Sequence, residues 1–150
     1  MVIDIQQFLA ATFTQPMSTK REPVPPKDYV ALIDEIELET FPGKKDTSKT
    51  YLKLSLIYSV DDPELKKQLN RDKVLVYDDF LLDLTEGGGL DFGKGKNVKL
   101  GRLREACGQN KEGQPWGFQM LKGQVVRIKV GQEMYKGDPQ STVEAVTAVQ

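Results

Sequence analysis

The stretch TYLKLSLIYSV, residues 50–60, carries the clearest structural signal in this chain of 150 residues. Leucine or tyrosine occupies every second position from residue 52 to residue 58. A two-residue period places these side chains on one face of a β-strand, because successive side chains point to opposite faces. The face expected to join the core comprises Leu52, Leu54, Leu56 and Tyr58.

Four further segments alternate in the same way and predict four more strands. They are expected at Tyr29–Thr40, Lys73–Leu84, Gln124–Val130 and Thr142–Val149. In the first of these, the alternating apolar residues are Val30, Leu32, Ile36 and Leu38. Pro42 and Gly43 end this strand, and a turn at Gly137, Asp138 and Pro139 joins the last two strands.

Helical signals lie in two of the connections. A helical turn is expected at Pro63–Leu69, in the insertion after the second strand. Asn97 is the expected N-cap of a longer helix, Val98–Cys107, and Gly108 is expected to stop it. Before this helix, five glycines from Gly87 to Gly95 disfavour regular structure and predict a mobile loop.

The order of the elements in the chain predicts the fold class. A repeat of strand–helix–strand units needs a helix between each pair of strands, which this pattern lacks. One helix between the third and fourth of five strands is the layout of an OB-type barrel. We therefore expect a mainly β fold, a five-stranded OB-type barrel, with a sandwich and an irregular α+β domain as alternatives.

Residues 1–26 are expected to form an N-terminal region of their own. Apolar residues recur there at helical spacing behind Asp4, the expected N-cap, and predict a short amphipathic helix over residues 4–13. They are Ile5, Phe8, Leu9 and Phe13. Prolines between residues 15 and 27 then predict an extended linker. The binding domain is therefore expected at residues 27–150, and the apolar stripe is expected to pack on it or to form a homo-oligomer.

The absence of histidine and the single cysteine exclude several kinds of site. Histidine is the usual general base near neutral pH, and structural zinc sites use His and Cys. Cys107 alone forms no intramolecular disulfide. We therefore expect no catalysis, no metal and no cofactor. No segment approaches the ~20 apolar residues of a membrane span, and Asp4 stands where a basic leader would begin, so we expect a cytoplasmic protein without membrane contact.

Two patterns resemble catalytic motifs and have simpler interpretations. Gly88, Gly93 and Lys94 match the spacing of a phosphate-binding loop, but Gly95 stands where Ser or Thr would ligate magnesium. A group of carboxylates suggests the magnesium site of a nuclease, but alternation along a strand points them to both faces. These carboxylates are Asp78, Asp79, Asp83 and Glu86. A flexible basic loop and a solvated acidic rim explain both patterns, and a metal-dependent nuclease stays a minor alternative.

The net charge of −1 conceals basic segments that also carry aromatic residues. Tyr51 and Lys53 share the non-core face of the second strand, and Arg127 and Lys129 share that of the fourth. Cations next to rings suit single-stranded nucleic acid, because the cations neutralise phosphates and the rings stack on bases. The predicted phosphate contacts are Lys44, Lys45, Lys49, Lys53, Lys94, Lys96, Arg102, Arg127 and Lys129, and the predicted stacking residues are Tyr51, Trp116 and Tyr135. The alternatives are a solvated basic surface and, for Trp116 with Phe118, the plug of a barrel end.

Five segments carry a resemblance to a known family. They are Pro26–Glu39, Tyr51–Ile57, Val76–Phe80, Leu100–Leu103 and Leu121–Val130. Over residues 25–137 the chain resembles small bacteriophage single-stranded-DNA-binding proteins of the OB-fold type. The resemblance implies a protein that coats single strands during phage DNA replication or recombination in the cytoplasm of the infected bacterium. Phage or host replication proteins are its implied further partners, and no enzymatic activity or cofactor is implied.

The C-terminus departs from the pattern of many such proteins, which end in an acidic tail that recruits replication partners. Residues 141–150 contain Glu144 as their single charged side chain, so recruitment by the tail is not expected. We predict a non-enzymatic protein that binds single-stranded DNA largely without sequence preference, with the loop Gly87–Lys96 closing over the strand. The main alternative is a protein-interaction module on the same fold, such as a phage accessory or structural protein, because fold alone does not decide function.

Overall fold

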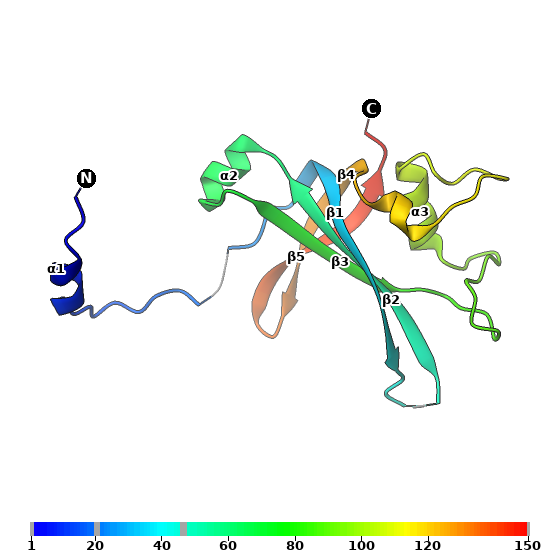
Figure 1. Cartoon of the computed structure of the whole chain (residues 1–150), viewed down its shortest axis with the longest axis horizontal. Coiled ribbons are helices and arrows are strands. Elements are labelled where there is room, and N and C mark those ends of the chain that lie inside the picture. The colour runs from blue at the N-terminus through cyan, green and yellow to red at the C-terminus, as the bar shows by residue number, and fades with distance from the viewer. Residues whose placement is uncertain (1, 20–21, 46–47, 150) are drawn as a thin grey trace.

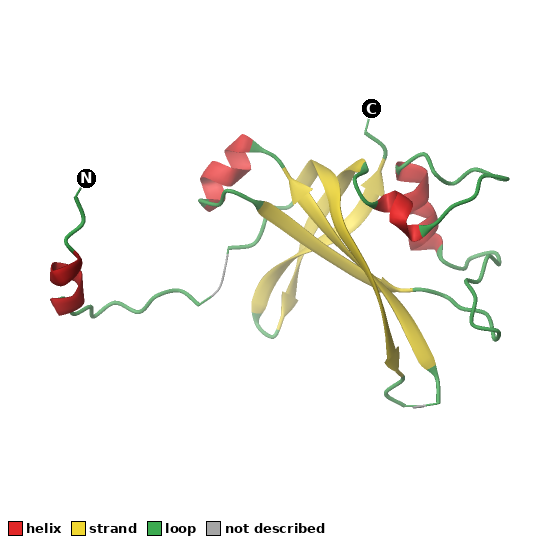
Figure 2. Cartoon of the chain, in the orientation of Figure 1, coloured by secondary structure: helices red, strands yellow, loops and turns green. Residues whose placement is uncertain are grey.

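Five strands and three short α-helices make up the structure, a computed structural model that describes residues 2–19, 22–45 and 48–149 (Figures 1 and 2). In chain order the elements are α1 (Ile5–Ala10), β1 (Lys27–Pro42), β2 (Thr50–Val60), α2 (Pro63–Leu69), β3 (Val74–Leu81), α3 (Val98–Ala106), the 3-10 turn η1 (Phe118–Leu121), β4 (Val125–Tyr135) and β5 (Asp138–Thr147). Every strand and helix expected from the sequence is present. The fold is mainly β, as predicted.

The strands form one antiparallel sheet in the order β3-β2-β1-β4-β5. The edge strands β3 and β5 approach each other, but no backbone ladder joins them in the described part of the chain, so the sheet is not closed. The segment before β1 bonds to β4 and β5 at this opening. The Val24 N–H donates to Ser141 Oγ at 2.8 Å, and Gln132 Nε2 donates to the Val24 carbonyl at 3.4 Å.

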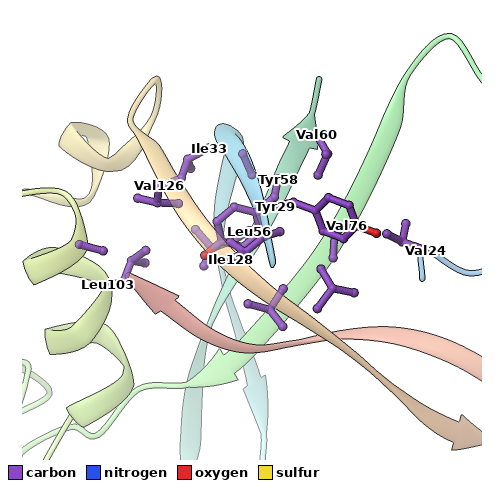
Figure 3. Packing of buried hydrophobic residues seen from close by; sticks show 14 of the residues in the cluster. Val24, Tyr29, Ile33, Leu56, Tyr58, Val60, Val76, Leu103, Val126 and Ile128 are labelled. Carbon is purple, nitrogen blue, oxygen red and sulfur yellow. The ribbon is translucent and has the colours of Figure 1, made fainter. Parts of the chain in front are cut away.

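The core lies on one face of the coiled sheet, and α3 covers one end of it (Figure 3). Leu54, Leu56 and Tyr58 of β2 are fully buried, as their alternation predicted, and Leu52 is half-buried. From α3, Leu103 points toward Val126 of β4. Each such side chain contributes about 1.5–3 kcal/mol to folding by leaving water, so the core fixes which face of every strand stays exposed.

A β-bulge in β1 overturns part of the predicted pattern of that strand. Its pairing with β2 shifts between Ile33 and Glu35. One extra residue reverses the faces of a strand, so the first half of β1 buries Tyr29 and Ala31 instead of Val30 and Leu32. Val30 and Leu32 are 46% and 38% exposed. After the bulge the inward set is the predicted one, beginning with Ile36.

The turn between β4 and β5 also differs from its predicted position. It consists of Lys136 and Gly137, while Asp138 and Pro139 already belong to β5. Both turn residues have positive φ, +51° and +84°. Two such residues give the type I′ turn, whose twist suits a two-residue hairpin. The two strands are therefore longer than the sequence pattern indicated.

The N-terminal helix α1 lies apart from the sheet at the end of an extended segment (Figure 1). Its predicted cap is present, because Asp4 Oδ1 accepts a hydrogen bond from the Gln7 N–H at 3.2 Å. The helix ends at Ala10, before Phe13, and every one of its residues is exposed. Val24 is already buried in the core, so the packed part begins before residue 27. Within the described ranges, no helix is long and apolar enough to cross a membrane.

Candidate nucleic-acid interface

The hairpin formed by β1 and β2 projects beyond the rest of the sheet and ends in a cluster of lysines (Figure 1). Phe41 and Tyr51 face each other across it, with ring centroids 5.8 Å apart and ring planes inclined by 26°. Lys44, Lys45 and Lys49 follow at the exposed tip and form no ion pair with any described residue. We call these five residues the hairpin tip. Its lysines are therefore free to meet an anion.

The loop between β3 and α3 leaves the sheet next to this hairpin. The Leu82 N–H donates to the Leu52 carbonyl at 2.9 Å, one residue from Tyr51. At its neck, Asp83 and Asn97 bind each other reciprocally. The Asp83 N–H donates to Asn97 Oδ1 at 2.7 Å, and the Asn97 N–H donates to Asp83 Oδ2 at 2.8 Å. Asn97 Nδ2 also donates to the Asp83 carbonyl at 2.9 Å.

This arrangement corrects two predictions for the segment, which we call the clasped loop (residues 82–97). Asn97 occupies the predicted N-cap position of α3, but its side chain makes no cap bond and holds Asp83 and Asp91 instead. Its φ of +50° is a left-handed conformation that asparagine tolerates better than most residues. The glycine-rich part contains a bridge between Leu84 and Leu90 and is held at its neck, so it has backbone pairing that the sequence did not predict.

The clasped loop presents an aromatic side chain that the sequence analysis did not select. Phe92 is 82% exposed, and Lys94 and Lys96 follow it without an ion pair to any described residue. An apolar ring at such exposure adds nothing to the core. The signal was available in the sequence, because Phe92 lies among glycines and lysines with no alternating apolar neighbours. Phe92, Lys94 and Lys96 thus combine a ring with two free cations.

The strand-face cations are less available than predicted. Lys53 Nζ lies 3.8 Å from Glu39 Oε2, and Lys129 Nζ lies 3.8 Å from Glu144 Oε2. Glu35 and Glu37 share the outer face of β1 with Glu39, where outer means the face away from the core. Carboxylates therefore interrupt the positive charge on this face, and the predicted continuous track is absent from it.

The structure also separates the two predicted groups of strand residues. Lys53 pairs with Glu39 on β1, whereas Arg127 pairs with Val30 near the start of the same strand. Nine residues of a strand span roughly 30 Å. Arg127 and Lys129 therefore lie far along the sheet from Tyr51 and Lys53.

Trp116 is held by protein partners on several sides. The Arg104 guanidinium lies 4.4 Å from its ring centroid, and the Phe118 ring packs edge-on at 4.9 Å. Its indole N–H donates to Gln109 Oε1 at 2.9 Å. The ring is half-buried and packs against the core. This geometry favours a role for Trp116 in closing the end of the core over a role in stacking on bases.

The remaining predicted residues lie away from the hairpin tip. Arg102, on α3, faces a groove beside β5 and forms no ion pair with a described residue. Tyr135 lies at the β4–β5 hairpin, where Lys136 Nζ is 5.3 Å from its ring centroid. Tyr77, which the sequence analysis did not select, is 62% exposed on β3. It lines the same cavity as Tyr135, and carboxylates surround both rings there.

Lys99 at the start of α3 contacts β3, although its side chain is still 48% exposed. Its Nζ is 3.1 Å from Asp78 Oδ1 and 4.8 Å from the Phe80 ring centroid. Burial raises the pKa of the Asp78 carboxyl, and the attraction of Lys99 offsets this only in part. The contact fixes the start of α3, and with it the C-terminal end of the clasped loop.

No model of a known protein family and no curated protein matches this chain. The geometry of the hairpin tip and the clasped loop therefore has to carry the functional argument.

Proposed function

We propose that this protein binds single-stranded DNA through the hairpin tip and the clasped loop, largely without sequence preference, and that its fold is an OB-type barrel left open between β3 and β5. The order of the strands supports this fold, because β1 lies between β2 and β4 and the edge strands approach each other. The helix α3 between β3 and β4 supports it as well.

The observation that carries the proposal is the gathering of free lysines beside exposed rings. Lys44, Lys45, Lys49, Lys94 and Lys96 have no carboxylate partner among the described residues. The rings of Tyr51 and Phe92 are exposed in the same two segments. Lysines release counterions from phosphates, and each stacked base gains about 1–3 kcal/mol whatever its identity. Binding of this kind needs no catalytic group and no cofactor.

The cellular role follows from the resemblance to phage proteins. We propose that the protein coats exposed strands during phage DNA replication or recombination, in the cytoplasm of the infected bacterium, where phage or host replication proteins would meet it.

A salt series tests the proposal. The affinity for a fluorescent oligothymidine is measured by anisotropy at several concentrations of sodium chloride. Five phosphate contacts on a single strand predict a slope of log affinity against log salt of about −3.5. A duplex of the same length should bind more weakly, because its bases are not free to stack. A slope near zero, or no binding at low salt, would contradict the proposal.

A second candidate, a protein-interaction module, has an observation of its own. The outer face of β1–β3 forms a cavity of about 450 Å³ lined by Glu35, Glu37, Tyr77 and Asp79. Such a surface repels phosphates and suits a basic peptide. Absence of oligonucleotide binding, together with binding of an oligolysine peptide that Glu37→Gln weakens, would favour this function.

A further inference from the structure

The helix α1 is an apolar element without a partner. Ile5, Phe8 and Leu9 lie on one side of it and are 68%, 61% and 75% exposed. A helix of six residues gains too little from its own hydrogen bonds to persist in water. It therefore needs a surface that covers its apolar side chains.

A groove between α3 and β5 offers such a surface. It has a volume of about 710 Å³. Its apolar lining consists of Val98, Ala106, Val143, Ala145, Val146 and Ala148. Three of these are alanines, whose small side chains leave the space between helix and strand unfilled. Val98, the first residue of α3, is 44% exposed at its rim.

We propose that α1 of one copy docks into the α3/β5 groove of a second copy. Figure 1 shows α1 at one end of the long axis of the molecule and α3 toward the other end. The chain between α1 and Val24 has 13 residues, 11–23, and spans at most ~47 Å when extended. The arm starts from a fixed point, because Val24 is buried and bonded to Ser141. In this arrangement α1 lies away from its own α3 and is free to reach the groove of a neighbour.

The charges of the two surfaces agree with this docking. Residues 2–19 contain a single charged side chain, Asp4, at the start of α1. The groove also has four charged lining residues, Lys99, Arg102, Glu105 and Glu144. Lys99 is paired with Asp78 and Glu144 with Lys129, which leaves Arg102 and Glu105 without an ion pair to any described residue. An acidic N-cap entering the groove beside Arg102 gives that guanidinium a partner while the apolar stripe covers the alanines.

The contact joins two different surfaces, and each copy offers one helix and one groove. Two copies that exchange their helices form a closed dimer, and repetition of the contact between successive copies gives an open row. If the proposed DNA binding holds, neighbours along one strand are joined in this way and bind it cooperatively.

The test measures self-association of the full chain without DNA, by sedimentation velocity over a range of concentrations. The wild type should form species that grow with concentration. Phe8→Glu should raise the dissociation constant by at least ~10-fold, because it places a carboxylate in an apolar groove. Gln7→Glu adds the same charge on the opposite side of α1 and should leave association intact. Ala145→Glu, at an exposed position of the groove, should act like Phe8→Glu.

Mixing the two defective variants identifies the partner. Phe8→Glu keeps an intact groove and Ala145→Glu keeps an intact helix, so the mixture should form a one-to-one complex that grows no further. A wild type that stays monomeric at every concentration would overturn the proposal, as would association that survives Ala145→Glu. A mixture without a complex would overturn it too, because the intact helix of one variant would then not bind the intact groove of the other. Oligonucleotide binding is measured separately, so failure here leaves the DNA-binding proposal standing.

Discussion

Asp78 shows how burial and charge oppose each other at a single residue. Its Oδ2 is buried without a hydrogen-bond partner in the described structure, while Oδ1 meets Lys99. Burial raises the pKa of this carboxyl above its ordinary value. The folded state therefore binds a proton more readily than the unfolded state. The free energy of unfolding must fall as the pH rises from the ordinary aspartate pKa through the raised one.

Asp78→Asn should remove this dependence. At pH 7 the variant is expected to be more stable than the wild type by about 1 kcal/mol, since it no longer buries a carboxylate. The gain should shrink as the pH falls through the raised pKa and should vanish below the ordinary aspartate pKa, where the carboxyl is protonated in both states. Urea unfolding at pH 7 and at about pH 3 measures the difference. Asp79→Asn, at the exposed neighbouring position, is the control, and a wild type more stable than Asp78→Asn at pH 7 would contradict the assignment.

At the scale of elements, the sequence predicted what depends on local alternation and missed what depends on distant partners. β2 and α2 have the predicted bounds, because the period of one and the Asp62–Pro63 start of the other are local. The faces of the first half of β1 were predicted wrongly, because the bulge after Ile33 is set by pairing with β2. The ion pair of Lys53 with Glu39 depends on the same register.

The clasp at Asn97 illustrates the same limit. An asparagine before a helix ordinarily caps it with its side chain. The neighbouring sequence does not indicate that the Asn97 side chain instead bonds to Asp83, 14 positions earlier. Exposure of Phe92 likewise depends on where the clasp holds the loop. Charge patterning in the sequence therefore predicted the lysines of the candidate site. It did not predict how they are arranged, because that depends on contacts between residues far apart in the chain.

Substitution of Asn97 tests the clasp. Asn97→Ala loses the side-chain bonds to Asp83 and Asp91 and places a Cβ residue at φ +50°. The expected loss of stability is about 2–4 kcal/mol, from the bonds and the left-handed backbone together. Asn97→Gly loses the same bonds without the strain and should cost ~1–2 kcal/mol less. Urea unfolding gives both values, and equal costs would contradict the backbone part of the argument.

Phe92 tests the loop as a binding element. Phe92→Ala should weaken oligothymidine binding by about 1–3 kcal/mol, the value of one stacked base. The salt slope should stay unchanged, since no cation is lost. Folding stability should also stay unchanged, because the ring is 82% exposed. Tyr77→Ala removes another exposed ring, on the acidic outer face, and should leave affinity intact. Equal losses in both variants would contradict a role specific to this loop.

At the scale of the whole molecule, the positive and negative charges nearly cancel in number, but folding pairs some lysines with carboxylates and leaves others unpaired. The net charge is −1, and several lysines far from the hairpin tip are paired with carboxylates. The lysines of the tip and of the clasped loop form no ion pair with any described residue, although the loop also carries Asp83, Glu86 and Asp91. The affinity for a nucleic-acid strand should therefore depend on where the unpaired lysines lie and not on the net charge of the protein.

Two triple variants with the same change of net charge separate these effects. The first variant replaces Lys44, Lys45 and Lys49 by Gln. Its salt slope should be less negative by about 2, because three single-strand phosphate contacts are lost. Lys66, Lys73 and Lys122 replaced by Gln remove three cations that already meet Asp61, Asp34 and Glu35. That variant should keep the wild-type slope within error, because its lysines release no counterions from DNA. If both triple variants flatten the slope equally, the protein attracts DNA through its overall charge, and the hairpin tip has no special part in binding.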